Sequence, residues 1–137
     1  EIMPSLVGSE MCIRDRNIKP VMTLENVREL MGYAENVTAE LSVRKYILSL
    51  VTATRNSDYV KLGVSPRGSI ALLKASKAYA FVQGRGFVMP DDVKAVMPDV
   101  LAHRLMLSPK GKSAFENERK ALENIALTVK SPDAIEK

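Results

Sequence analysis

The sequence predicts a mainly α-helical protein, a small bundle of four to five helices with one or two very short strands. Only 5% of the 137 residues are aromatic and tryptophan is absent, so the core has to be built from aliphatic side chains and methionine. Apolar residues recur at helical spacing along residues 39–55, and residues 66–83 are apolar over most of a helical circumference. The length is that of one domain with a real core.

The first two predicted helices each follow a threonine that can serve as N-cap. Thr23 precedes a helix over about residues 24–35, and Thr38 precedes the clearest amphipathic helix, over about residues 39–55. Arg55 lies off the apolar stripe of this second helix. The stripe repeats at intervals of three and four residues and consists of Val43, Tyr46, Ile47, Leu50, Val51 and Thr54.

A loop over residues 59–64 leads into the third predicted helix, residues 66–83. Ser65 fits the N-cap because its hydroxyl can accept a hydrogen bond from a free amide of the first turn. Pro66 fits the first helical position, where no N–H is needed, and Gly84 suits a left-handed C-cap at the other end. Because this helix is apolar on most sides, we expect it to be the central buried helix.

In the remaining third of the chain, proline and serine residues mark where the predicted helices begin or break. Pro90 opens a fourth helix, which Pro98 is expected to break or restart. Ser113 is expected to cap a last helix that runs to about Val129. Brief extended segments are expected at Val37, at residues 87–88 and at residues 105–107.

Charge is concentrated in the middle of the chain. The net charge is +4, and residues 41–90 contain eight Lys or Arg but only one acid, Asp58. Such a skew suggests a surface that faces phosphate or an acidic partner, with a solvated basic face as the alternative. The single cysteine excludes a disulfide framework. No apolar run is long enough for a membrane span or a signal peptide, so we expect a cytoplasmic protein.

Arg67 is the candidate functional residue. It lies one residue inside a predicted helix N-terminus, where free amides and the helix dipole favour an anion. A cation gains nothing from the dipole there, so the placement makes sense if an anion from outside shares the site. A solvated surface arginine is the alternative. Lys74 and Lys77 project within about a quarter turn of Arg67, so the polar edge of this helix is basic.

No catalytic or metal-binding set can be assembled from the other residues. His103 is the only histidine. The acids at residues 91–92 are explained by the electrostatics of a helix start. Residues 111–113 read Gly-Lys-Ser, but a phosphate-binding loop needs an earlier glycine where Met106 stands.

Residues 62–75, Leu-Gly-Val-Ser-Pro-Arg-Gly-Ser-Ile-Ala-Leu-Leu-Lys-Ala, resemble the lid domain of MoxR-type AAA+ ATPases. The family pattern is a loop ending in Gly-Ala-Ser-Pro-Arg, followed by a helix rich in alanine and leucine. The resemblance implies a bundle of the AAA+ lid type with a C-terminal arm over residues 17–132, firmest over residues 23–109. Further matches follow in family order at residues 46–47, 53–55, 84–85, 88–93 and 100–105.

The resemblance implies a role for each residue of the Ser-Pro-Arg motif. Arg67 matches the sensor 2 arginine, which reaches the γ-phosphate of ATP at the junction of core and lid and stabilises charge on the transferring group. Ser65 and Pro66 would lie beside the nucleotide. Two positions depart from the family. Met89 stands where a Thr or Ser cap is usual, and Gly68 stands where alanine is common, at a cost of about 0.5–1 kcal/mol in helix stability.

The resemblance also implies a larger assembly, a chaperone-like protein-remodelling homo-hexamer with ATP and Mg²⁺ held by a core domain. Proteins with von Willebrand factor A domains would be its partners. The Walker A and Walker B motifs, sensor 1 and arginine finger of that core are not in the sequence, so this chain alone is not expected to hydrolyse ATP.

The two ends of the chain are not expected to belong to the lid. Residues 1–16 resemble a translated sequencing adapter, which predicts a non-native leader in front of a fragment, and residues 133–137 read as a tail. The alternative function is a stand-alone basic helical module that binds nucleic acid or a protein partner. Nucleic acid is the weaker choice because the most basic helix is predicted to be buried.

Overall fold

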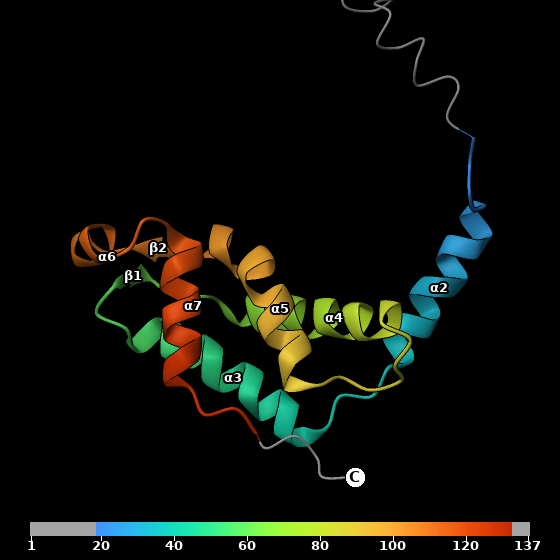
Figure 1. Ribbon diagram of the computed structural model, residues 1–137, viewed down its shortest axis with the longest axis horizontal. Coiled ribbons are helices and arrows are strands. Elements are labelled where there is room, and N and C mark those ends of the chain that lie inside the picture. The colour runs from blue at the N-terminus through green and yellow to red at the C-terminus, as the bar shows by residue number, and fades with distance from the viewer. Residues whose placement is uncertain (1–18, 133–137) are drawn as a thin grey trace, which may run out of the picture. The chain divides into compact units, whose positions relative to one another are not determined.

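The computed structural model describes residues 19–132. The chain divides into two compact units, residues 1–30 and 31–137, and each is described by itself. The mainly α-helical bundle with very short strands is confirmed. The predicted leader and tail lie outside the described residues. The elements (Figure 1) are α2 (Leu24–Asn36), α3 (Leu41–Asn56), β1 (Val60–Leu62), α4 (Pro66–Val82), α5 (Pro90–Leu101), the 3-10 helix η2 (Ala102–Arg104), β2 (Met106–Leu107), α6 (Pro109–Ala114) and α7 (Glu118–Thr128).

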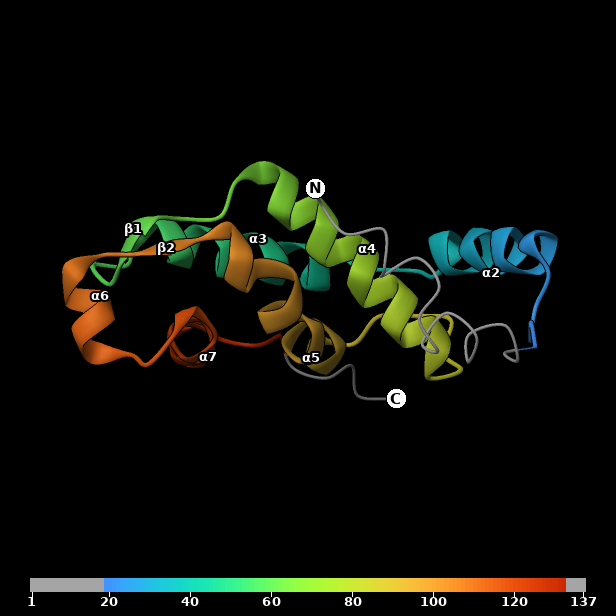
Figure 2. The same ribbon diagram turned by 90° about the horizontal axis from the view of Figure 1, so that it is seen from above.

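Four helices of the second unit share one hydrophobic core. α4 packs mainly against α5 and α3, and α7 packs against both α3 and α5 (Figures 1 and 2). Each helix contributes a fully buried leucine: Leu50 from α3, Leu72 from α4, Leu101 from α5 and Leu122 from α7. Burial of one leucine side chain stabilises a fold by about 1.5–3 kcal/mol, so this leucine cluster joins the four helices.

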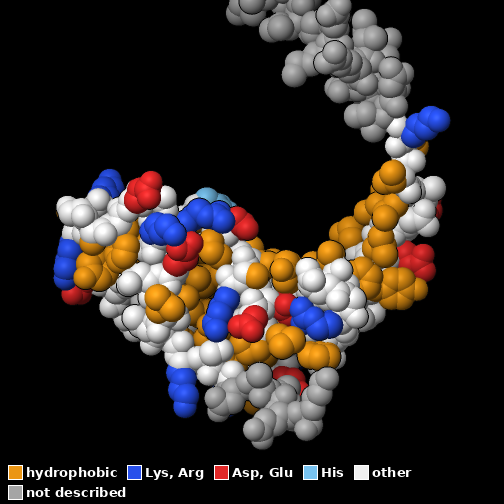
Figure 3. Space-filling view, viewed as in Figure 1, with side chains coloured by type: hydrophobic (Ala, Val, Ile, Leu, Met, Phe, Trp, Pro, Cys, Tyr) orange, Lys and Arg blue, Asp and Glu red, His pale blue; other side chains and the backbone are white. Residues whose placement is uncertain are grey.

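α2 forms as predicted, but its apolar face is not buried. The Thr23 hydroxyl accepts a hydrogen bond from the Asn26 N–H at 3.2 Å, which confirms the predicted cap. No residue of α2 is buried, and Leu24 and Met31 are 59% and 62% exposed. Figure 3 shows hydrophobic side chains gathered along this helix. An apolar helix face of this kind is typical of a surface that another protein segment covers.

α3 begins later than predicted because Thr38 is extended and does not cap it. The Thr38 N–H donates to the Gly86 carbonyl and the Val88 N–H donates to the Thr38 carbonyl, both at 2.9 Å, in a parallel bridge between Thr38 and Phe87. The extended segment predicted at residues 87–88 takes part in this bridge, and its partner is Thr38, the residue after Val37. The helix therefore starts at Leu41. All six residues of the predicted apolar stripe are buried.

α4 has the predicted ends but is buried along one stripe only. Gly84, with φ +74°, provides the left-handed turn that follows its C-terminus. Ile70 and Val82 are 59% and 78% exposed, so the prediction of a helix buried on most sides is wrong. The neighbouring helices cover one side of α4 and leave the opposite side open. The buried stripe consists of Gly68, Leu72, Ser76 and Ala80.

β1 replaces part of the loop predicted over residues 59–64. It pairs antiparallel with β2, the segment that the sequence predicted as extended. The Ser108 hydroxyl reinforces the pairing by donating to the Asp58 carbonyl at 2.8 Å. Only one of the three residues of β1 is partly buried, so the strand carries no alternating pattern from which it could be predicted.

Pro98 lies inside α5 and does not break it, contrary to prediction. The helix is continuous over Pro90–Leu101 although an interior proline removes a backbone donor, at a cost of about 3 kcal/mol. Val93, Met97 and Leu101 are buried at one-turn intervals on one face of α5. Their packing holds the helix together across the proline.

The C-terminal region contains two helices where the sequence predicted one. Ser108 caps α6 by accepting a backbone N–H at 3.1 Å, and the Asn117 side chain caps α7 by accepting another at 3.0 Å. Ser113, the predicted cap, lies inside α6. α7 turns Ala121, Leu122 and Ile125 into the core. Within residues 19–132 no helix is both long enough and apolar enough to cross a membrane.

Candidate functional site

The predicted site residues, Ser65, Pro66 and Arg67, lie together at the start of α4, and all three are exposed. Ser65 is the N-cap residue, as predicted, but its hydroxyl accepts no capping hydrogen bond within the described chain. The Ser65 carbonyl instead accepts the Gly68 N–H at 2.8 Å, and the Ser69 hydroxyl donates to the Pro66 carbonyl at 2.6 Å. One backbone hydrogen bond and the Ser69 side chain therefore close the first turn.

Arg67 extends from this first turn as an exposed side chain. Within residues 19–132 its guanidinium has no hydrogen-bond or ion-pair partner. A guanidinium carries five N–H donors in a planar fork that matches the oxygens of phosphate or carboxylate. The start of α4 thus presents a cation whose donors are available to an anion outside this unit.

Arg67 begins a basic edge on the open side of α4. Lys74 and Lys77 follow on that side, opposite the buried stripe. The Lys77 ammonium donates to the Glu35 carbonyl at 2.9 Å and so joins α4 to the last turn of α2. A groove of about 610 Å³ lies beside this contact and does not include Arg67. Its lining consists of Met31, Ala34, Glu35, Ile70, Leu73, Lys74, Lys77 and Ala78.

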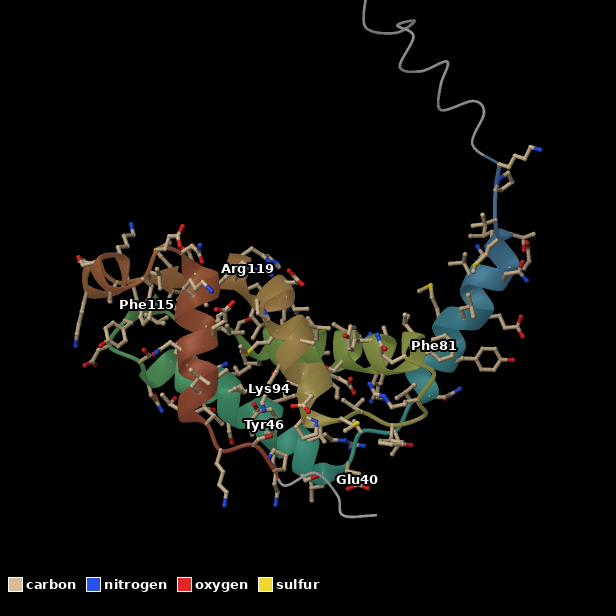
Figure 4. All side chains as sticks on the ribbon, in the orientation of Figure 1. Glu40, Tyr46, Phe81, Lys94, Phe115 and Arg119 are labelled. Carbon is tan, nitrogen blue, oxygen red and sulfur yellow. The ribbon has the colours of Figure 1, made fainter. Side chains whose placement is uncertain are left out.

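An aromatic contact also joins the ends of α2 and α4. The rings of Tyr33 and Phe81 stack with centroids 6.4 Å apart and an interplanar angle of 17°, and Figure 4 labels Phe81 near the end of α4. Such a pair contributes about 0.5–1.5 kcal/mol beyond the area that it buries. The last turn of α2 is therefore fixed to α4 by one hydrogen bond and one aromatic stack.

The last turn of α3 holds the loop that leads to Arg67. The Thr54 hydroxyl accepts the Val64 N–H at 3.1 Å, and the Arg55 Nε donates to the Val64 carbonyl at 2.7 Å. Thr54 and Val64 are buried. Both backbone polar groups of Val64 are thereby occupied. The apolar pattern did not predict this contact, because Thr54 matched the apolar stripe and Arg55 lay off it.

Two glycines allow the loop and helices to approach closely. A Cβ atom on Gly63 would lie 2.7 Å from the Arg55 Cγ and 2.8 Å from its Cα. A Cβ atom on Gly68 would lie 2.2 Å from the Val64 Cγ1. From the sequence, Gly68 was expected only to lower the stability of the helix. Its close packing against Val64 explains why a glycine stands there.

An ion pair fixes the opposite end of α4 to the start of α5. The Arg85 guanidinium contacts both carboxylate oxygens of Asp92, one of them at 2.6 Å, and the Met89 N–H donates to the same carboxylate at 2.8 Å. Burial alone would raise the pKa of Asp92, but the hydrogen bonds from Arg85 and Met89 outweigh it and lower this pKa below its ordinary value. The expectation that this acid serves the helix start is confirmed.

The basic middle of the sequence is only partly a charged surface. Four of its eight cations have partners inside the protein: Arg44 donates to the Ala39 carbonyl at 2.7 Å, and Arg55, Lys77 and Arg85 make the contacts described above. Four of the eight cations that suggested a phosphate-facing surface therefore stabilise the fold through hydrogen bonds within the protein.

The remaining candidates do not assemble into a site. His103 is exposed on η2. Gly111 lies in α6, where an added Cβ would approach the Tyr59 carbonyl oxygen to 2.1 Å, so packing explains this glycine. The Tyr46 hydroxyl is buried in the described part of the protein without a partner, and burial raises its pKa. Residues 19–132 contain no group of three His, Cys, Asp or Glu able to hold a metal ion.

The family model for the AAA lid domain matches residues 52–125. This range runs from the last turns of α3 into α7 and includes the loop that leads to Arg67, Arg67 itself and the buried leucines of α4, α5 and α7. The match covers more than half of the chain, and the chain belongs to the AAA lid domain family.

The relatives identify the type of lid. The chain is 41% identical over 84% of its length to the uncharacterized protein YeaC of Bacillus subtilis. It is 38% identical over 66% of its length to protein MoxR of Paracoccus denitrificans, and 33% identical over 66% to chaperone MoxR1 of Mycobacterium tuberculosis. The resemblance to MoxR-type AAA+ ATPases indicated by residues 62–75 is thus confirmed. The alignments cover 36%, 30% and 26% of these relatives, so the chain spans about a third of their length.

A solved structure shows the same fold. The crystal structure of a protein from Cytophaga hutchinsonii, assigned as an ATPase, matches 90% of this chain with a TM-score of 0.75 and 29% sequence identity. The match covers 42% of that protein.

Proposed function

We propose that the chain is the C-terminal lid of a MoxR-family ATPase and that Arg67 is its sensor 2 arginine. The observation that carries the proposal is an exposed guanidinium without a partner in the described chain, at the start of a helix whose preceding loop is fixed. In this role Arg67 reaches the γ-phosphate of ATP bound by a core domain, which also holds Mg²⁺. Ser65 and Pro66 shape the turn beside the nucleotide.

The chemistry proposed for Arg67 is electrostatic. As the γ-phosphoryl group transfers, negative charge is spread over its oxygens, and a preorganised guanidinium stabilises that charge. A lone cation neither positions the attacking water nor holds Mg²⁺. The lid alone is therefore expected not to hydrolyse ATP.

The assembly proposed for the whole protein is a cytoplasmic hexamer with a chaperone-like remodelling activity, acting on proteins with von Willebrand factor A domains. Its support is the family, the relative named as a chaperone and the exposed apolar side chains of α2. Apolar surface of this extent is typical of a face that is covered in an assembly.

The test is Arg67→Ala in the full-length ATPase that contains this lid. Loss of one preorganised donor to a developing anion typically lowers kcat by about 10²–10³-fold, and we expect a fall of this order in steady-state ATP turnover. Affinity for ADP should be unchanged, because ADP lacks the γ-phosphate. Lys61→Ala removes an exposed positive charge from β1 and serves as the matched control. If Arg67→Ala turns over ATP at the wild-type rate, Arg67 is not the sensor.

A further inference from the structure

We infer that Thr54 and Arg55, in the last turn of α3, are the positioning residues for Arg67. The inference rests on the proposed function, because it concerns the accuracy with which Arg67 is held. Neither residue is assigned a contact with the nucleotide. They act through the backbone of Val64, three residues before the arginine.

Val64 is held from three directions. Thr54 occupies its N–H at 3.1 Å, Arg55 occupies its carbonyl at 2.7 Å, and Gly68 packs against its side chain so closely that an added Cβ would lie 2.2 Å from Cγ1. Val64 is 0% exposed and Thr54 is 1% exposed, so water does not compete for the hydrogen bond between them, whereas the bond from Arg55 is partly buried. The residue cannot shift without breaking a buried contact.

The segment between Val64 and Arg67 depends on this attachment. Ser65 and Pro66 are exposed, and within the described chain the Ser65 hydroxyl makes no capping bond. The Arg67 guanidinium itself has no partner among residues 19–132. The backbone before the first turn of α4 is therefore located by its contact with α3, and the position of the Arg67 Cα follows from it.

Gly63 strengthens the contact from the other side of Val64. A Cβ at Gly63 would overlap the backbone and the Cγ of Arg55, at 2.7–2.9 Å, so the loop lies directly on the end of α3. The Arg55 Nε is committed to the Val64 carbonyl. Since displacement of a catalytic group by about 1 Å can cost about 100-fold in rate, a loop fixed in this way has a direct effect on turnover.

Thr54 offers the cleanest test because it is buried and cannot touch a ligand. Thr54→Val keeps the shape of the side chain but removes the oxygen that accepts the Val64 N–H, whereas Thr54→Ser keeps that oxygen. In the full-length ATPase we expect Thr54→Val to lower kcat about tenfold, with KM for ATP and affinity for ADP within about twofold of wild type. Thr54→Ser should retain wild-type kcat.

The result that is specific to positioning is whether the loss of kcat caused by Thr54→Val depends on the presence of Arg67. In an Arg67→Ala background, Thr54→Val should cause no further loss of kcat, because there is no arginine left to position. The same fold loss with and without Arg67 would overturn the inference, since it would reveal a general structural defect. Arg55→Met, at an exposed position, is the second variant and decides the question if Thr54→Val fails to fold.

The two proposals fail in distinguishable ways. If Arg67→Ala leaves ATP turnover unchanged, the proposed function is wrong. If Arg67→Ala lowers turnover while folded Thr54→Val and Arg55→Met proteins both retain wild-type kcat, only the positioning role is wrong.

Discussion

Gly68→Ala should destabilise the protein even though alanine is the better helix former. In a helix interior the replacement gains about 1 kcal/mol. Against this gain, the new Cβ would lie 2.2 Å from the Val64 Cγ1, whereas its distance of 3.5 Å from the Leu101 Cδ2 is an ordinary contact. Overpacking a core costs about 1–3 kcal/mol, and a contact this short with a fixed neighbour belongs in the upper part of that range. We therefore expect a net loss of about 1–2 kcal/mol.

Urea denaturation of the full chain, followed by far-UV circular dichroism, measures this loss as a lower midpoint with an unchanged m-value. In a thermal melt the same loss corresponds to a fall in Tm of roughly 3–10 °C. Gly32→Ala, in α2, is the control because nothing lies within 4 Å of its added Cβ, and it should not destabilise. The cost of Gly68→Ala should largely disappear in a Val64→Ala background. A Gly68→Ala protein as stable as wild type would refute the role of Val64.

Two further predictions concern the core and the turn between α4 and α5. Leu72→Ala, at a fully buried position, should lower the free energy of unfolding by about 2–5 kcal/mol in the same urea assay, and a smaller loss would mean that α4 is less well packed than described. The pKa of Asp92 lies below its ordinary value of 3.8, so its stabilising contribution is present above that value and is lost as pH falls through the lower native-state pKa. The stability gap between wild type and Asp92→Asn, measured from urea midpoints, should therefore narrow as pH falls below that ordinary value, and a constant gap would contradict the assigned ion pair.

The start of α4 could be predicted because its signals are local. Ser65 followed by Pro66 marks a helix start by the conformations that the two residues favour, and Gly84 marks the end in the same way. The amphipathic stripe of α3 could be predicted for a similar reason, since a period of three and four residues needs a buried face. The position of Arg67 at a helix N-terminus followed directly from the assignment of Ser65 and Pro66 to the start of α4.

Contacts between distant segments could not be predicted in this way. β1 is stabilised by pairing with β2, and its three residues alone carry no strand pattern. Thr38 has a side chain suited to capping, but a bridge to Phe87 holds its backbone extended. Pro98 would end an isolated helix, yet burial of its neighbours on α5 outweighs the missing donor.

The contact that fixes Val64 was missed for the same reason. Thr54 satisfied the apolar pattern, and nothing in that pattern shows that its hydroxyl accepts a hydrogen bond from a loop ten residues away. Two observations in the sequence did bear on it. Gly63 and Gly68 lie on either side of Arg67, and closely spaced glycines near a functional residue indicate that backbones approach each other there.

The leucine cluster determines how the unit responds to a force at its edge. α4 has 17 residues, so Arg67 and the Arg85–Asp92 pair lie near opposite ends of a rod about 25 Å long. Leu72 of α4 is fully buried in the same core as Leu50 of α3, Leu101 of α5 and Leu122 of α7. Because a close-packed interior has low compressibility and transmits strain, we expect a force on the Arg67 guanidinium to be passed along α4 to the helices packed against it. Arg67 is therefore expected to move together with the four packed helices and not separately from them.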